Sequence, residues 1–488
     1  MSQKISIEER LRASTIPGIH TVYKSGELSV SEVTKFFLDR IEQYNSRLNA
    51  VISINPEALS IANAQDQQLQ SSLAMGPLFG IPILVKDNIE TRELPTTAGS
   101  LALASNETKK DADVVQRLRA AGAIILGKSN LSEWANFRSS RSSSGWSAIG
   151  GQARNPYDLS RSTSGSSSGS GAGVAALLAI AALGTETNGS IIGPATLNGL
   201  VGLKPNISLV SQDGMVPISH SQDTAGPMTR SILDAAILLN VMACSEDTQD
   251  YQGALDKSAL QDKRIGIVRS FCGFHEGVDE VFESAVEIMK MAGATIVDQL
   301  VLRPDRQFHK DAAAVLEYEF KHNLNRYLKG LPGALSKMTL ESLITFNEEH
   351  AGDEMLFFKQ EIFLSSQARG SLSDPNYLLA LENVQGETRE NGIDRLIKQD
   401  DLDVLIAPSS GAAWKIDPIN GDHYVGRGTS AYPAISGYPH ITLPMGTLHG
   451  LPLGISIMGP AFSESTLLSI AYSFEQHAKI DIAPELDG

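Results

Sequence analysis

The sequence predicts an α/β protein: a single large domain with a mixed, largely parallel central sheet covered by helices on both faces. Two observations support this prediction. Helix-like and strand-like patterns alternate along much of the chain, as they do where helices wrap around a parallel sheet. In addition, 42% of the 488 residues are hydrophobic, which is enough to bury one large core.

The alternation of elements is clearest in the first half of the chain. Residues 29–49 open with Ser-x-x-Glu, a helix-start signal, and carry apolar residues at helical spacing. Residues 80–89 form a short β-branched run that predicts a buried strand. Residues 112–129 predict a helix, a glycine stop and a second strand. Similar helix and strand patterns recur at 231–242, 264–268, 276–298 and 403–407.

We interpret residues 1–488 as one domain, because no internal repeat and no strong linker divides them. Residues 1–75 are expected to form an N-terminal helical layer, and 76–240 the core that carries the site. Residues 303–400 are mostly helical in pattern, most clearly at 312–328. We expect this insertion to lie near the substrate pocket, as a lid or as part of its wall.

Charge and cysteine content exclude several classes of function. The net charge of −16 repels phosphate backbones and anionic membranes, so neither nucleic acid nor membrane is an expected partner. Cys244 and Cys272 are too few for a disulfide framework and favour a reducing compartment. The N-terminus lacks an apolar signal region, and the longest apolar run, 172–184, is too short for a membrane span. These features predict a cytoplasmic protein.

Two familiar ligand signals are weak in this chain. Residues 122–129, GAIILGKS, match the phosphate-loop pattern, but their middle residues are strand-like, so we reject nucleotide binding. The ten histidines show no metal-binding spacing, and nothing around His220 requires it as a base. We therefore expect no metal and no cofactor.

A serine-rich and glycine-rich run, residues 162–173, holds six serines and four glycines. Its composition resembles a flexible linker, yet it leads directly into the apolar stretch 174–184, which we predict to be a buried helix. Gly165–Gly169 match the nucleophile-elbow pattern around Ser167, although the turn-rich segment before them is a poor strand. A second serine and glycine site, residues 184–190, ends in Ser190. Two structural turns and a pair of reactive serines both remain possible.

Lys86 favours the reactive pair. It ends the apolar stretch ILVK, where burial would disfavour its charged form and lower its pKa. A fall from about 10.4 to near 7 needs roughly 4–5 kcal/mol of differential solvation. A neutral lysine would then supply a base without histidine.

At these residues the chain resembles the amidase signature family of serine hydrolases. Ser190 lies 24 positions after Ser166, and Lys86 lies 80 positions before Ser166, which matches the family's Ser–cis-Ser–Lys arrangement. The resemblance covers nearly the whole chain. It includes the stretches GPLFGIPILVKDNIET, GAIILGKSNLSEWA, GSSSGSGAGVAAL, GTETNGSIIGPATLNGLVGLKP, SQDTAGPMTRS, SGYPHITLPMG and GLPLGISIMG.

The resemblance implies an amidase that uses an acyl-enzyme. Ser190 would be the nucleophile, Lys86 the base and Ser166 the relay, with a cis peptide at Gly165–Ser166. Gly165, Thr185 and Asp223 would support these groups. The implied oxyanion hole consists of the backbone N–H groups of Thr187, Asn188, Gly189 and Ser190.

The stretches SEWANFRSS, GTETNGSI and VPISHSQDTAGPM resemble the branch that removes the amide from C-terminally amidated peptides. Ser164 and Ser168 replace glycines that are usual in the family, and Ile192 replaces a common arginine, which disfavours acidic substrates. Ser140, in the serine-rich loop 139–144, and Ile192 are the expected substrate contacts. The expected partner is a peptide or small-molecule amide, and the expected state a monomer or homodimer.

Three alternatives stay open. The chain could hydrolyse small aliphatic or aromatic amides, or it could be the glutaminase-type subunit of an amidotransferase. The third is a non-catalytic binding protein on the same fold.

Overall fold

A computed structural model describes residues 6–71, 75–244 and 249–486; residues 1–5 and 72–74 of the predicted N-terminal layer lie outside them. Its centre is one sheet of 11 strands. In spatial order these are β1 (Val51–Ile54), β3 (Ile124–Ser129), β2 (Pro82–Lys86), β6 (Ala181–Glu186), β8 (Thr224–Thr229), β7 (Val201–Lys204), β12 (His440–Leu448), β13 (Leu451–Met458), β11 (Val404–Pro408), β9 (Arg264–Val268) and β10 (Thr295–Leu300). A separate small hairpin joins β4 (Trp146–Ser147) and β5 (Gly151–Gln152).

The sheet is mixed, as the sequence predicts, but it is not largely parallel, since four of its strand pairings are parallel and six are antiparallel. Parallel pairing occurs in two groups, where β2 pairs with β3 and β6, and β9 pairs with β10 and β11. The strands between these groups pair antiparallel. Part of the reason is the short turn between β12 and β13, since only antiparallel strands can be joined so closely.

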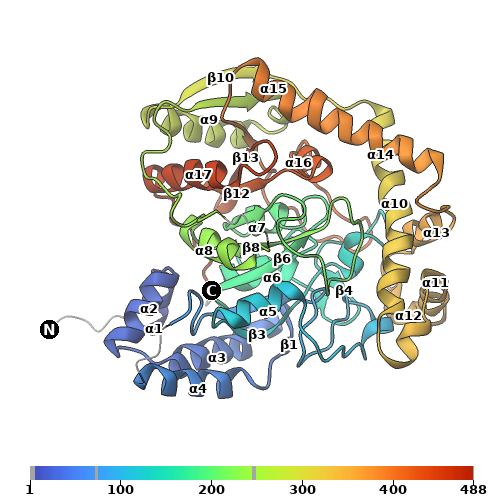
Figure 1. Ribbon diagram of the computed structural model, residues 1–488, viewed down its shortest axis with the longest axis horizontal. Coiled ribbons are helices and arrows are strands. Elements are labelled where there is room, and N and C mark those ends of the chain that lie inside the picture. Colours follow the sequence, from blue (N-terminus) through green and yellow to red (C-terminus); the bar gives the residue numbers. More distant parts are fainter. Residues whose placement is uncertain (1–5, 72–74, 245–248, 487–488) are drawn as a thin grey trace.

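Helices cover both faces of the sheet and one flank (Figure 1). The N-terminal layer contains α1 (Ile7–Arg12), α2 (Ile16–Ser25), α3 (Val30–Leu48) and α4 (Ala58–Gln70). The helices around the sheet are α5 (Asp113–Ala120), α6 (Ser168–Ala175), α7 (Ile192–Leu197), α8 (Ile232–Met242), α9 (Glu276–Met291), α16 (Ala431–Ser436) and α17 (Glu464–Ala478). Segment 303–400, along the right and top of Figure 1, holds α10 (Arg306–Lys329), α11 (Leu340–Glu349), α12 (Ala351–Glu354), α13 (Glu361–Gln367), α14 (Pro375–Thr388) and α15 (Asp394–Gln399).

Local signals placed several elements correctly. Ser29 caps α3 by accepting a hydrogen bond from the backbone N–H of Glu32, whose side chain bonds back to the backbone N–H of Ser29. The predicted strand in 80–89 is β2, and the predicted helix and strand in 112–129 are α5 and β3.

The predicted helix at 174–184 is wrong. Helix α6 starts inside the serine-rich and glycine-rich run and ends at Ala175, and β6 begins at Ala181. Glycine allows the helix to start here because another segment of backbone lies very close to it. A Cβ added at Gly169 would lie 2.1 Å from the carbonyl oxygen of Ala50. Helix, turn and strand are all buried, so hydropathy does not distinguish them.

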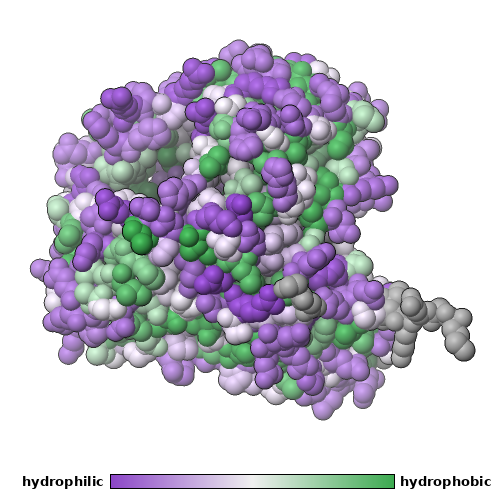
Figure 2. All heavy atoms as spheres, turned by 180° about the vertical axis from the view of Figure 1, so that it is seen from behind, coloured by the Kyte–Doolittle hydropathy of each residue, from purple (hydrophilic) through white to green (hydrophobic). Residues whose placement is uncertain are grey.

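The outer surface mixes polar and apolar residues. Hydrophilic and hydrophobic residues are interspersed over the face seen in Figure 2, as is typical of globular proteins. Among the described helices, none combines the length and apolar composition that a bilayer crossing requires.

Candidate active site

The predicted base lies at the end of β2, below the protein surface. Lys86 is 0% exposed, and its Nζ lies 2.7 Å from Ser166 Oγ. The same nitrogen donates to the hydroxyl of Thr185 (2.8 Å) and to its carbonyl oxygen (3.1 Å). Burial lowers the pKa of Lys86 to about 7, against the opposing effect of the more distant carboxylates of Asp223 and Glu186. The neutral amine is therefore accessible near neutral pH.

The predicted relay residue is equally buried. Ser166 is 0% exposed, and the Gly165–Ser166 peptide is cis. The backbone N–H of Ser132 donates to the Ser166 carbonyl oxygen (3.0 Å). A Cβ added at Gly165 would lie 2.2 Å from Ser132 Oγ, so only glycine fits beside the relay.

A donor-rich loop, residues 187–190, follows β6. Within the described residues, no acceptor is present for the backbone N–H groups of Thr187, Asn188, Gly189 and Ser190. The next two N–H groups, of Ile191 and Ile192, both donate to Glu186 Oε2 (2.8 and 3.0 Å). Gly189 has a φ of +80°, which glycine adopts without strain. The loop thus presents four unpaired donors.

Ser190 ends this loop, and 8% of it is exposed. Its carbonyl oxygen accepts from the Ser167 N–H (3.2 Å). In the part of the chain that the structure describes, Ser190 Oγ makes no hydrogen bond, neither to Ser166 nor to any other residue. The hydroxyl is free to meet a ligand.

Thr185 and Asp223 are hydrogen-bonded to two predicted site residues, Lys86 and Thr187. Thr185 Oγ1 accepts from Asn88 Nδ2 (2.9 Å) as well as from Lys86. Asp223 accepts from Thr187 Oγ1 (2.6 Å), and burial raises the pKa of its carboxyl group to about 6. Both residues contact a predicted site residue through side chains.

Ser167 is committed to structure rather than chemistry. Its hydroxyl donates to the carbonyl oxygen of Thr185 (3.1 Å), accepts from the Thr185 N–H (3.2 Å), and is fully buried. Ser168 Oγ donates to the carbonyl oxygen of Ser164 (2.8 Å). The nucleophile-elbow alternative therefore has no accessible serine at its centre.

The two predicted substrate contacts differ in position. Ser140 is exposed, and its backbone N–H and its hydroxyl donate to Glu361 of α13 (both 2.8 Å), which joins loop 139–144 to the helical insertion. Ile192, the first residue of α7, is only 2% exposed. Its backbone N–H donates to Glu186 Oε2 (3.0 Å), and its side chain carries no charge.

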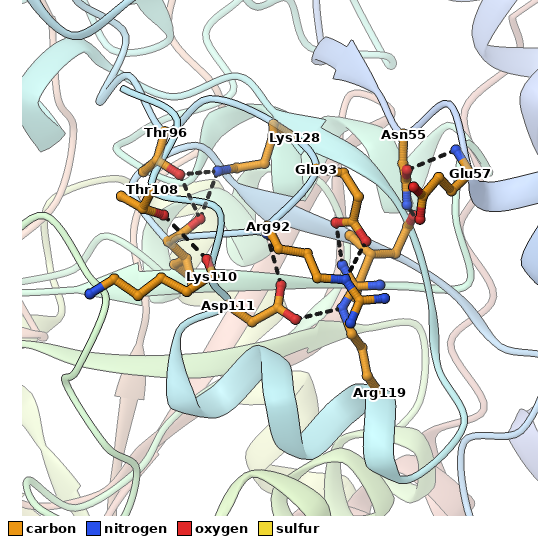
Figure 3. Close-up of polar contacts among 12 residues, drawn as sticks. Asn55, Glu57, Arg92, Glu93, Thr96, Thr108, Lys110, Asp111, Arg119 and Lys128 are labelled. Atoms are coloured by element: carbon orange, nitrogen blue, oxygen red, sulfur yellow. Dashed lines mark hydrogen bonds and ion pairs between the residues drawn. The ribbon is translucent and has the colours of Figure 1, made fainter. Parts of the chain in front are cut away.

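The phosphate-loop match has a structural explanation. Its lysine, Lys128, is 0% exposed and lies 3.2 Å from the carboxylate of Asp87. Figure 3 shows its side chain directed at Thr96, to whose hydroxyl it donates (2.8 Å). In the same view, Arg119 forms ion pairs with Glu93 (2.5 Å) and Asp111 (3.0 Å). These contacts fix the loop between β2 and α5, and residues 124–129 of the phosphate-loop pattern form strand β3.

Sequence reasoning missed several supporting residues. Asn88 stands two positions after Lys86, so its place in the same motif was an available signal. Ser430 donates to Asn188 Oδ1 (3.1 Å) from 242 positions away, and no local pattern indicates that contact. Among the described residues, no group of three or more His, Cys, Asp or Glu could hold a metal ion.

The strand-end lysine, Ser166 and the donor-rich loop stand at the positions that the resemblance to the amidase signature family implies for its site, and Lys86 contacts Ser166. The family model for amidases matches residues 32–468, and the chain belongs to the amidase signature family. It is 41% identical to the peptide amidase of Stenotrophomonas maltophilia, with a TM-score of 0.91 over 98% of this chain and 99% of that one. A protein of Arabidopsis thaliana named a probable amidase is 36% identical over 99% of this chain and 93% of its own. A glutamyl-tRNA(Gln) amidotransferase subunit from Caldanaerobacter subterraneus is 34% identical over 98% of this chain and 99% of its own.

Proposed function

We propose that this chain hydrolyses carboxamide C–N bonds through an acyl-enzyme on Ser190, with Lys86 as base and Ser166 as relay. The observation that carries the proposal is the 2.7 Å contact between Lys86 Nζ and Ser166 Oγ in a fully buried setting. A lysine with a pKa of about 7 is poised to exchange a proton near neutral pH.

In the first half-reaction, neutral Lys86 accepts the Ser166 proton while Ser166 accepts the proton of Ser190. Ser190 Oγ then forms a bond to the amide carbon. The negative charge that develops on the carbonyl oxygen is stabilised by the unpaired N–H groups of residues 187–190. Ser166 gives a proton to the amide nitrogen, Lys86 returns one to Ser166, and the C–N bond breaks to release the amine or ammonia.

The second half-reaction uses the same groups. A water molecule loses a proton to the Ser166–Lys86 pair and attacks the acyl carbon. The ester bond breaks, and the proton passes back to Ser190 Oγ. The carboxylic acid leaves, and the three side chains return to their starting protonation states.

The proposed substrate is the C-terminal carboxamide of a peptide. The 41% identity to a peptide amidase supports it, and so does Ile192, which leaves no fixed cation in the place where an acidic substrate would need one. A carboxylate desolvated there without a partner would cost several kcal/mol. We propose loop 139–144 and the helical insertion as pocket walls, an arrangement supported by the bonds of Ser140 to Glu361.

A glutaminase-type function within an amidotransferase is the second candidate, and the 34% identity to a glutamyl-tRNA(Gln) amidotransferase subunit favours it. Such a protein would hydrolyse glutamine, whose charged α-carboxylate and ammonium distinguish it from a blocked peptide amide. Comparison of the two substrates separates these functions.

The test of the nucleophile compares Ser190→Ala with Ser167→Ala, a matched pair of serine-to-alanine changes. Ammonia release should be abolished in the first and reduced only mildly in the second. Circular dichroism should show both folded. An active Ser190→Ala variant, or an inactive but folded Ser167→Ala variant, would transfer the role to Ser167.

The test of the substrate measures ammonia release at equal concentrations of an N-blocked dipeptide amide, its free acid, glutamine and malonamate, and cleavage of an unamidated longer peptide. The dipeptide amide should be hydrolysed fastest. Faster turnover of malonamate or glutamine, or cleavage inside the longer peptide, would contradict the proposed peptide-amide specificity.

A further inference from the structure

A buried carboxylate lies in the middle of the helical insertion. Glu319, on α10, is 0% exposed. Its Oε2 accepts from Ser219 Oγ (2.5 Å), Ser221 Oγ (3.0 Å) and the Ser221 N–H (3.2 Å). Its Oε1 accepts from Tyr377 Oη (2.8 Å) on α14. Three of these four bonds therefore reach out of the insertion to a loop that precedes β8.

One turn further along α10, Asn323 contacts the same loop. Its Nδ2 donates to the carbonyl oxygen of Ile218 (3.5 Å) and lies 3.2 Å from His220 Nδ1. His220 Nδ1 is itself 3.6 Å from Glu319 Oε2. Because a buried carboxylate is strongly destabilising without its hydrogen bonds, this set of contacts defines one position of the loop relative to α10.

The loop leads directly to the active site. The backbone N–H groups of Ile218 (2.7 Å) and Ser219 (2.8 Å) donate to Asp223 Oδ2, and Asp223 Oδ1 accepts from Thr187 Oγ1 (2.6 Å). Gln222 Nε2 donates to the carbonyl oxygen of Thr187 (3.0 Å). A continuous set of hydrogen bonds thus joins Glu319 to the first residue of the donor-rich loop.

We propose that Glu319 is a positioning residue for amide hydrolysis: it holds loop 218–223 and, through Asp223, the backbone N–H groups that stabilise the oxyanion. This role rests on the proposed function. It makes the insertion a fixed support of the catalytic loop, in addition to a wall of the pocket.

The expected signature is a loss of kcat with little change in KM. Displaced N–H donors weaken the transition state, where the oxygen carries charge, more than the ground state. Complete removal of one such donor typically lowers kcat by about 10²–10³-fold, so a displaced donor should cost about 10–100-fold.

The experiment uses the full-length chain and an amide substrate that the wild type hydrolyses. Glu319→Leu removes all acceptors and should lower kcat by about 10–100-fold, with KM changed by less than about twofold. Glu319→Gln should restore kcat to within about threefold of wild type, because its carbonyl oxygen can still accept from the loop and its amide can donate to Tyr377 Oη.

The matched control is Tyr377→Phe, which removes one bond to the same carboxylate on the side away from the loop. It should lower Tm and leave kcat unchanged. If Glu319→Leu does not fold, Ser219→Ala combined with Ser221→Ala removes the hydroxyl bonds from the loop side, and should lower kcat by several-fold.

Equal losses of kcat in Glu319→Leu and Tyr377→Phe, or an unchanged kcat in the folded Glu319→Leu or double-serine variant, would overturn the positioning role alone. The rate at which a fluorophosphonate labels Ser190 provides a readout that is independent of the substrate, and should fall with kcat. A wild-type chain that neither hydrolyses amides nor labels at Ser190 would instead overturn the proposed function, and this role with it.

Discussion

Two neighbouring strand ends carry buried lysines with opposite surroundings. β2 and β3 run parallel, with Val85 opposite Lys128 and Lys86 opposite Ser129, and both lysines are 0% exposed. Lys128 lies 3.2 Å from the carboxylate of Asp87 and donates to the carbonyl oxygen of Ile89 (2.6 Å). Among the residues that the structure describes, Lys86 has only hydroxyl groups and one carbonyl oxygen within hydrogen-bond distance.

The difference places one residue type in two surroundings that suit it to different tasks. Burial lowers the pKa of both ammonium groups, and at Lys128 an adjacent carboxylate opposes the shift. Lys128, paired with the carboxylate of Asp87, holds the loop that follows β2 in place. A lysine with neutral neighbours loses its proton near pH 7 and can serve as a base.

The strongest test of this comparison replaces each lysine by alanine. Lys86→Ala should lower the rate of amide hydrolysis by about 10³-fold or more while the protein stays folded. Lys128→Ala leaves the buried Asp87 unpaired and should cost about 3–5 kcal/mol of stability. Turnover and denaturant unfolding of both variants provide the measurements. A folded, fully active Lys86→Ala variant would contradict its assignment as base.

The pH profile tests the protonation state of Lys86. With a pKa of about 7, the neutral base predominates above pH 7, and below that value its fraction falls about tenfold per pH unit. Activity should decline accordingly on the acidic side, as measured by kcat/KM between pH 5 and 9. A profile that is flat down to pH 5 would mean that no group of this pKa is required.

Replacing each lysine by methionine should have a smaller effect, on the free energy of unfolding, and the expected effects at the two positions have opposite signs. Between pH 7 and 10.5, Lys86 is largely deprotonated in the folded protein but still protonated in the unfolded chain. For a fall in pKa from 10.5 to about 7, this difference lowers the free energy of unfolding by about 4 kcal/mol near pH 7. Lys86→Met should therefore stabilise the protein by about 2–4 kcal/mol at and below pH 7.

This advantage should shrink as the pH rises from 7 to 10.5, because the unfolded lysine then loses its proton as well. Lys128→Met should instead destabilise the protein. Urea unfolding of both variants at pH 7 and pH 9.5 gives the comparison. A destabilised Lys86→Met variant at pH 7 would show that its hydrogen bonds outweigh the desolvation cost.

The smallest expected effect is that of metal removal. If Lys86 provides the base, exhaustive EDTA treatment should leave ammonia release unchanged within the error of the assay. Loss of activity that a divalent ion restores would require a catalytic partner other than this lysine.

Much of the site could be predicted because its residues lie in short motifs. Lys86, Ser166 and Ser190 each follow an apolar or glycine-rich signal, and the structure brings Lys86 and Ser166 into contact. Within the described part of the chain, the four N–H groups of the implied oxyanion hole have no acceptor. The roles of these groups in catalysis remain predictions.

Other features could not be predicted, since they depend on packing between distant segments. The run 174–184 is apolar throughout, and only tertiary contacts decide that it contains a helix end, a turn and a strand. The burial of Ile192 could not be predicted, because a family motif indicates which residue occupies a position but not how exposed that residue is. Glu319 and Ser430 reach loops 218–223 and 187–190 from far along the chain, and no local pattern marks them.

The strand order also has a consequence for synthesis on the ribosome. The last two strands of the chain, β12 and β13, are inserted between β7 and β11 in the middle of the sheet. Until residues 440–458 have left the ribosome, β7 and β11 lack these neighbours, so that strands formed there would have unprotected edges that can pair with other chains. The lysine and both serines are made early, yet the sheet that holds them becomes continuous only after residues 440–458 have been made. A stop codon anywhere before the final hairpin therefore yields a chain suited to chaperone binding or proteolysis rather than catalysis.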